Sequence, residues 1–98
     1  MTHQEILDRL YENIEALIKI QQVPIGVFEK AIGVSTGYIS RSKAHNVDMP
    51  ITTVVRIAEY FNVPTDYLIY QTYKANYLRQ QIESMKKQLE DVEQGLKQ

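Results

Sequence analysis

Apolar residues recur at helical spacing through most of the chain and divide it into five predicted helices. The first is predicted over residues 3–20, where Thr2 and Glu5 have the spacing of a capping box ahead of the apolar stripe Ile6, Leu10, Ile14, Leu17 and Ile18. Two short helices are predicted over residues 24–32 and 35–43. A fourth follows Pro50 and is traced by Ile51, Val54, Val55, Ala58 and Phe61. The pattern therefore predicts an all-α chain.

The fifth helix is predicted to run without a break from about residue 65 to residue 96, since no proline follows Pro64. At 1.5 Å per residue it would be about 48 Å long, more than a small domain can cover. Its apolar residues alternate steps of three and four, which is a heptad seam: Ala75, Leu78, Ile82, Met85, Leu89, Val92 and Leu96. The seam is predicted to pair with a second copy as a coiled coil, and folding back onto the domain is the alternative. A parallel pair would place Lys74 near Arg79 of the partner subunit, so the orientation stays open.

The two short helices meet at a tight turn within residues 28–43. Their apolar residues are expected to share one core: Phe28, Ile32, Val34 and Ile39. Gly33 can take the positive φ of the turn, and Ser35 offers its hydroxyl as a helix N-cap. This spacing is that of a helix-turn-helix, a motif that usually binds DNA. It leaves outward, as candidates to enter a major groove, Thr36, Gly37, Ser40 and Arg41.

Charge and composition restrict the function classes. The net charge is −1, with six basic against eight acidic residues in 1–70 and five against four in 71–98. This balance argues against strong non-specific affinity for phosphate backbones, although residues 30–47 contain no acid. The 98 residues include no cysteine, no signal-like segment and no apolar stretch of the roughly 20 residues that span a bilayer. We therefore expect a cytoplasmic protein without disulfides or a membrane partner.

Several short segments together resemble the Xre-type helix-turn-helix family, which includes phage Cro proteins and phage repressors. They are Ile-Gly-Val-Ser at 32–35, Tyr-Ile-Ser at 38–40, Met-Pro-Ile at 49–51, Arg-Ile-Ala at 56–58 and Phe-Asn-Val-Pro-Thr-Asp-Tyr-Leu at 61–68. The resemblance covers residues 4–70. It implies a compact five-helix, lambda-repressor-like domain over residues 1–70, and the apolar seam predicts an added dimerisation helix over residues 71–98. It also implies base-facing roles for the four outward residues named above.

Two positions depart from the family pattern. Phe28-Glu29 stands where the family usually has Leu-Ala, and Ile25 stands where it has a glutamine that often contacts DNA. Glu29 is expected to pair with Lys30, Arg41 or Lys43.

Each candidate has a structural alternative. Arg41 can hold O6 and N7 of a guanine through two hydrogen bonds, or it can be a solvated arginine paired with Glu29. Lys43, His45 and Asn46 are candidate phosphate contacts, or simply solvated. His45 is not expected to bind a metal, because His3 is the only other histidine. Tyr70, Tyr73 and Tyr77 are expected to pack the fifth helix against the domain or its dimer partner, with stacking on bases as the alternative.

These observations predict a homodimeric, sequence-specific transcriptional regulator of phage or bacterial type, with repression as the expected outcome, that binds double-stranded DNA at a palindromic operator. A protein-interaction module that kept the fold and lost DNA affinity, such as an antirepressor, is the main alternative. No nucleophile with a base, no phosphate-cradling glycine loop and no metal cluster can be assembled from the sequence. An enzyme, a cofactor and a small-molecule ligand are therefore not expected.

Overall fold

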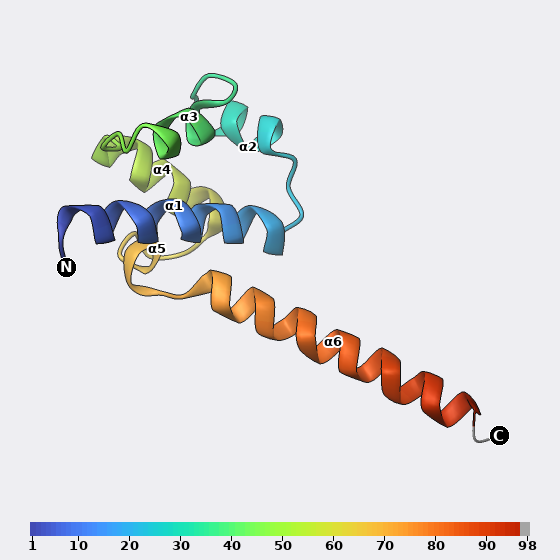
Figure 1. The fold of residues 1–98 in the computed structure, drawn as a ribbon. Coiled ribbons are helices and arrows are strands. Elements are labelled where there is room, and N and C mark those ends of the chain that lie inside the picture. Colours follow the sequence, from blue (N-terminus) through green and yellow to red (C-terminus); the bar gives the residue numbers. More distant parts are fainter. Residues whose placement is uncertain (97–98) are drawn as a thin grey trace.

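The computed structural model describes residues 1–96, and within that range every regular secondary-structure element is a helix. The helices are α1 (His3–Ile20), α2 (Ile25–Ala31), α3 (Tyr38–Ala44), α4 (Ile51–Phe61), α5 (Tyr67–Tyr70) and α6 (Tyr73–Leu96) (Figure 1). The all-α prediction is confirmed. The predicted number of five is wrong, because the long C-terminal helix is two helices, α5 and α6. None of the helices in residues 1–96 combines the length and the apolar composition needed to cross a lipid bilayer.

Thr2 is the N-cap of α1, and one of the two bonds of the predicted capping box is formed. The hydroxyl of Thr2 accepts a hydrogen bond from the N–H of Glu5 at 3.2 Å and lies 3.2 Å from the Glu5 carboxylate. Leu10, Ile14 and Leu17 of the predicted stripe are buried, and the prediction is wrong at its first residue. Leu7 is buried, whereas Ile6 is 36% exposed. Ile51 on α4 is likewise 68% exposed, and Ile57 takes the place in the core.

The core is centred on Phe28, the first apolar residue of the predicted helix-turn-helix. Its side chain is fully buried, and its ring lies 5.1 Å from that of Phe61 and 5.3 Å from that of Tyr60. Such aromatic pairs contribute about 0.5–1.5 kcal/mol beyond the area they bury. The other members of the core come from α1, α3, α4 and α5 and from Ile32, which directly follows α2: Leu7, Leu10, Tyr11, Ile14, Leu17, Ile32, Ile39, Val54, Ile57, Ala58, Phe61 and Leu68. Residues 1–70 thus share a single core.

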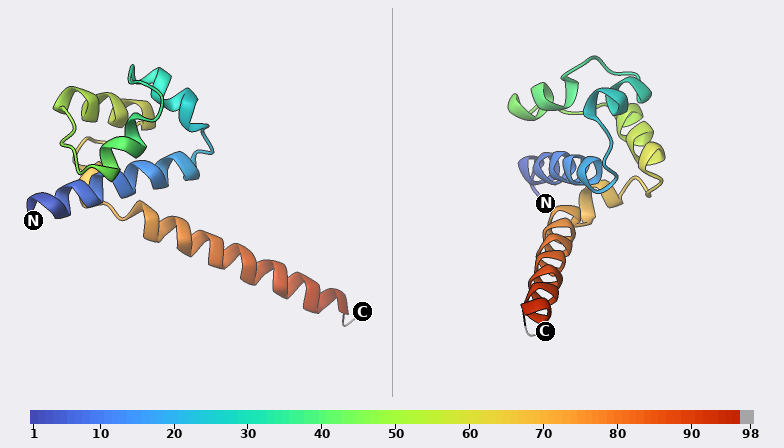
Figure 2. Two further views of the ribbon diagram at one scale, coloured as in Figure 1. Left: turned by 45° about the horizontal axis from the view of Figure 1, so that its top comes forward. Right: turned by 90° about the vertical axis from the view of Figure 1, so that its right-hand side faces the viewer.

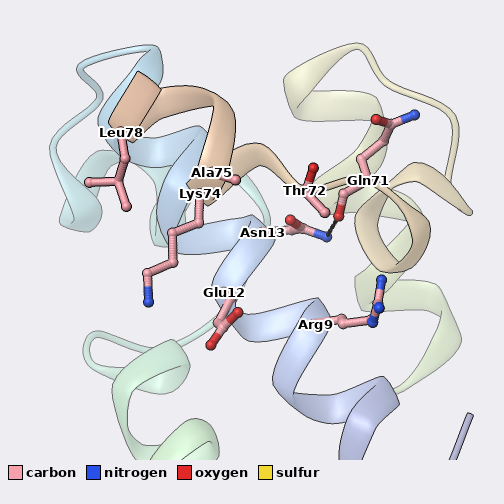
Figure 3. A pocket seen from close by; sticks show the side chains of 8 residues that line it. All are labelled: Arg9, Glu12, Asn13, Gln71, Thr72, Lys74, Ala75 and Leu78. Atoms are coloured by element: carbon pink, nitrogen blue, oxygen red, sulfur yellow. Dashed lines mark hydrogen bonds between the residues drawn. The ribbon is translucent and has the colours of Figure 1, made fainter. Parts of the chain in front are cut away.

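Asn13 on α1 holds the junction at which the C-terminal helix breaks. Its buried amide donates to the carbonyl oxygens of Leu68 at 2.6 Å and Gln71 at 3.0 Å, and its oxygen accepts from the N–H of Tyr73 at 3.2 Å. These contacts satisfy backbone groups that a helix end leaves without partners. Figure 3 shows Asn13 directed at Gln71. Asn13 therefore stabilises the break at residues 71–72 and sets the direction in which α6 leaves the domain.

Helix α6 projects from the globular part of the molecule (Figures 1 and 2). The Cα radius of gyration is 16.9 Å, whereas a compact chain of about 100 residues has roughly 13 Å. Tyr73 packs against the core, as expected for packing onto the domain, but Tyr70 lies on α5 and is 66% exposed. The seam residues from Leu78 to Val92 are all at least half exposed. The alternative that the seam folds back onto the domain is therefore wrong.

Tyr11 fastens α1 to the segment that follows α3. Its side chain is 2% exposed, and its hydroxyl donates to the carbonyl oxygen of Val47 at 2.6 Å. Burial is the main reason why the pKa of Tyr11 is raised above its ordinary value of 10.0. The tyrosine is therefore neutral in the fold at pH values where it ionises in the unfolded chain.

We expect Tyr11→Phe to lower the free energy of unfolding by about 1 kcal/mol at neutral pH, through loss of the hydrogen bond. A raised folded-state pKa contributes stability that is present below pH 10.0 and is lost as the pH rises through the folded-state value. The difference between wild type and Tyr11→Phe should therefore shrink above pH 10. Urea unfolding of both proteins at neutral pH and at about pH 11 measures this difference in the free energy of unfolding. A difference that stays constant over this range would contradict the assignment.

Candidate nucleic-acid interface

The turn between α2 and α3 is longer than predicted. Gly33 has φ of +78°, as expected, and Val34 is partly buried against the core. Helix α3 starts at Tyr38, three residues after the predicted start, so Ser35 is not its N-cap. The carbonyl of Ser35 accepts from the N–H of Tyr38 at 3.1 Å, and its hydroxyl accepts from Arg41. Two residues expected on the helix, Thr36 and Gly37, therefore lie in the turn before it.

Glu29 caps α3 from outside the helix. The side chain is 2% exposed, and its two carboxylate oxygens accept from the N–H groups of Gly37 at 3.0 Å and Ile39 at 3.2 Å. A carboxylate at a helix N-terminus satisfies unpaired donors and complements the positive end of the helix dipole. The expected pairing of Glu29 with Lys30, Arg41 or Lys43 is wrong, because these backbone donors occupy the carboxylate. The contact joins α2 to α3 and fixes how α3 is presented.

Gly37 is favoured by the backbone conformation of the turn. Its φ is +81°, in the left-handed region that glycine adopts without strain. A Cβ at this position would lie 2.9 Å from Nη1 of Arg41. The Arg41 guanidinium folds back over the turn, where Nη1 donates to the carbonyl of Thr36 at 2.8 Å and Nη2 to the hydroxyl of Ser35 at 2.9 Å. These two bonds leave three of its five N–H donors for other partners.

The structure keeps most of the predicted candidates on one exposed surface. Ile39 and Ser42 turn inward, while the side chains of Ser40 and Arg41 lie on the exposed part of α3. Thr36 is exposed in the turn before the helix, and Gly37, the N-cap residue of α3, is half-buried. We call this exposed set, with Thr36, Ser40 and Arg41 as its side chains, the α3 surface.

The three candidate phosphate contacts lie toward the other end of α3. Lys43 forms an ion pair with Glu15 of α1 at 3.0 Å, and both side chains are partly exposed. His45 follows the last turn, and Asn46, with φ of +51°, accepts a hydrogen bond from the side chain of Gln4 at 3.1 Å. Lys43 is thus drawn toward α1, away from Arg41. An exposed ion pair of this kind contributes about 0–1 kcal/mol to stability. Lys43 can therefore leave Glu15 at little cost and bind another anion, such as a phosphate.

The segment that contains the α3 surface carries positive charge and no acid of its own, although Glu15 of α1 pairs with Lys43. Residues 30–47 contain Lys30, Arg41 and Lys43 and no Asp or Glu, and the preceding acid, Glu29, is buried. Burial of Glu29 was not predictable from its position, because a carboxylate after Phe28 has the pattern of a surface charge. Because the Glu29 carboxylate occupies the N–H groups of Gly37 and Ile39, the Arg41 guanidinium is the group on the α3 surface that can bind an anionic ligand.

Two further properties bear on the chemistry that this part of the molecule supports. Among residues 1–96, no three His, Asp or Glu side chains come together in a way that could hold a metal ion. The described buried side-chain nitrogen and oxygen atoms all have hydrogen-bond partners.

No protein-family model, curated protein or solved structure matches this chain.

Proposed function

We propose that this chain is a sequence-specific DNA-binding transcriptional regulator of phage or bacterial type, with a lambda-repressor-like helix-turn-helix. The observation that carries the proposal is the α3 surface. It presents Arg41 among small residues, it has no exposed acid within residues 30–47, and it is held rigidly by the buried Glu29 cap. A short helix that is held in place and carries one long hydrogen-bond donor, Arg41, is suited to direct contact with base edges in a major groove.

Arg41 is the group on which base recognition rests in this proposal. The hydrogen bonds to Thr36 and Ser35 hold the guanidinium at the start of α3, which is the end of a recognition helix that usually meets the bases. Its remaining donors can bind O6 and N7 of a guanine. Ser40 and Thr36 allow close approach, and Lys43, His45 and Asn46 would contact phosphates once Lys43 leaves Glu15.

A homodimer built by α6 completes the proposal. Two copies of the α3 surface, related by a two-fold axis, would match a palindromic operator whose half-sites lie one helical turn or a multiple of it apart. The exposed apolar seam of α6 supports this assembly.

We expect Arg41→Ala to lower discrimination between the preferred operator and single-base variants by about 5- to 150-fold at the guanine it contacts, which corresponds to about 1–3 kcal/mol. Operators selected from random DNA by the wild type, followed by fluorescence anisotropy titrations at several salt concentrations, provide the measurement. Lys19→Ala, which removes the same charge from the end of α1, should leave the sequence preference unchanged. Recovery of no specific sequence by the wild type would contradict the proposed function.

A protein-interaction module remains the second candidate, because the intrachain contacts of Arg41 and Lys43 and the net charge of −1 favour it. This candidate predicts no salt-dependent DNA binding. For no DNA sequence should the logarithm of the affinity fall with the logarithm of the salt concentration. The same titrations therefore distinguish the two candidates.

A further inference from the structure

Helix α6 exposes a continuous apolar seam that no other part of the described chain covers. Its side chains are 50% to 64% exposed: Leu78, Ile82, Met85, Leu89 and Val92. The side chain of Leu96, also predicted in the seam, lies outside the described residues. Ala75 lies at the domain end, where it lines a groove of about 330 Å³ with Arg9 and Glu12 of α1 (Figure 3). Leu78 lines the same groove but is 50% exposed, so the exposed seam runs from Leu78 to Val92.

We infer that α6 pairs with α6 of a second copy in the antiparallel orientation, with Ile82 opposite the partner's Val92 and Met85 opposite the partner's Leu89. This inference deepens the dimer of the proposed function and rests on it only for its relevance to DNA. In antiparallel coiled coils, a positions of one helix meet d positions of the other. Ile82 and Leu89 are a positions and Met85 and Val92 are d positions, so every layer between residues 82 and 92 pairs two large apolar side chains.

The charges beside the seam favour this arrangement over a parallel one. With these layers, Arg79 lies beside the partner's Glu93, and the two-fold axis forms the same attractive pair twice. The one like-charged contact is Lys86 with the partner's Lys86 on the axis. A parallel pair would instead bring Lys74 beside the partner's Arg79, twice, with no attractive pair to offset the repulsion. A shift of one heptad that places Ile82 opposite the partner's Met85 would bring Arg79 beside the partner's Lys86. The opposite shift, with Leu89 opposite the partner's Val92, would pair Lys86 with the partner's Glu93 but would leave Leu78 and Ile82 without a residue opposite them.

The distribution of charge along α6 gives an independent argument. Residues 73–82 contain two bases and no acid, whereas residues 88–96 contain three acids, Glu90, Asp91 and Glu93, and no base. The dipole of a single helix favours the reverse order, with acids at its start and bases at its end. In an antiparallel pair the basic start of each helix lies beside the acidic end of the other, and the two dipoles oppose. The order of basic and acidic residues, which is unfavourable within one α6 helix, thus gives attraction between two antiparallel α6 helices.

The orientation determines where the two domains lie. The pairing is centred on residue 87, so the two copies of Tyr73 are 28 residues apart along the pair, which is about 42 Å. A parallel pair would hold both junctions about 10 Å apart, at one end. The antiparallel dimer therefore carries its two α3 surfaces at opposite ends of the α6 pair.

Disulfide cross-linking tests the orientation without DNA. The chain has no cysteine, so Ile82→Cys and Val92→Cys each introduce one thiol. Reduced and mixed, then oxidised, the two variants should form a covalent dimer, while each alone should not, since two copies of residue 82 lie about 15 Å apart along the pair. Efficient cross-linking of Ile82→Cys alone would indicate a parallel pair and overturn the inference. Absence of a dimer in every mixture and in sedimentation of the wild type would also overturn it.

A charge reversal gives a second test whose sign depends on the orientation. Arg79→Glu should weaken the dimer about tenfold in sedimentation equilibrium, because attraction to the partner's Glu93 becomes repulsion. Arg79→Glu combined with Glu93→Arg should restore it, and Lys87→Glu on the outer face of α6 should leave it nearly unchanged. A stronger dimer for Arg79→Glu would indicate the parallel pair, in which Lys74 gains an opposite charge. These results stand whether or not the protein binds DNA.

Discussion

Glu29→Ala is expected to lower the free energy of unfolding by about 3 kcal/mol, which for a domain of this size lowers Tm by about 12–24 °C. The substitution leaves the N–H groups of Gly37 and Ile39 without their acceptors in a buried site and removes the negative charge at the start of α3. Thermal unfolding followed by circular dichroism measures the effect.

The isosteric change Glu29→Gln shows how much of the lost stability comes from the hydrogen bonds, because it leaves the volume of the side chain almost unchanged. An amide offers one acceptor oxygen, so one of the two N–H groups loses its partner and faces the NH2 group instead. We expect a loss of about 1.5 kcal/mol. Glu59→Gln removes the same charge from the exposed side of α4 and should change stability by less than about 0.5 kcal/mol. Equal effects of Glu29→Gln and Glu59→Gln would show that the cap contributes nothing.

Glu29 illustrates which part of the candidate interface the sequence could predict. Phe28, Ile32 and Ile39 were placed in the core correctly, because burial of apolar residues follows from helical spacing alone. A carboxylate beside Phe28 carries no such periodic signal. Its burial depends on two N–H donors, eight and ten residues later, which face it only once the turn has formed. The late start of α3 has the same origin, since Gly37 and Glu29 provide the cap that Ser35 was expected to provide.

The break between α5 and α6 shows the same limit at longer range. Gln71 and Thr72 are compatible with a helix, and neither proline nor glycine marks the end of α5. The alternative conformation is stabilised by Asn13, which is 58 residues from Gln71 and 60 from Tyr73 along the chain. A polar residue inside the apolar stripe of α1 was a signal that such a contact existed. Its partners became apparent only in the folded chain.

Replacing Ile82 and Leu89 together by Asp is expected to convert the proposed dimer to a monomer and to weaken the proposed operator binding by about 100-fold or more. Each change places a charge in a core layer of the α6 pair, where burial without a partner is strongly unfavourable. Both residues are at least half exposed in the single chain, so the globular domain should keep its Tm. Loss of the second domain removes the gain in affinity that comes from binding two half-sites on one DNA molecule.

Sedimentation and anisotropy titrations on one set of variants measure both consequences. The matched control is Gln80→Asp with Gln94→Asp, which adds the same charge to the outer face of α6 and should leave the dimer intact. If the control also loses operator affinity, repulsion between the added charge and DNA is responsible, and not the loss of the dimer. A monomer that keeps full affinity for a palindromic operator would show that one α3 surface is sufficient and that α6 serves a purpose other than pairing half-sites.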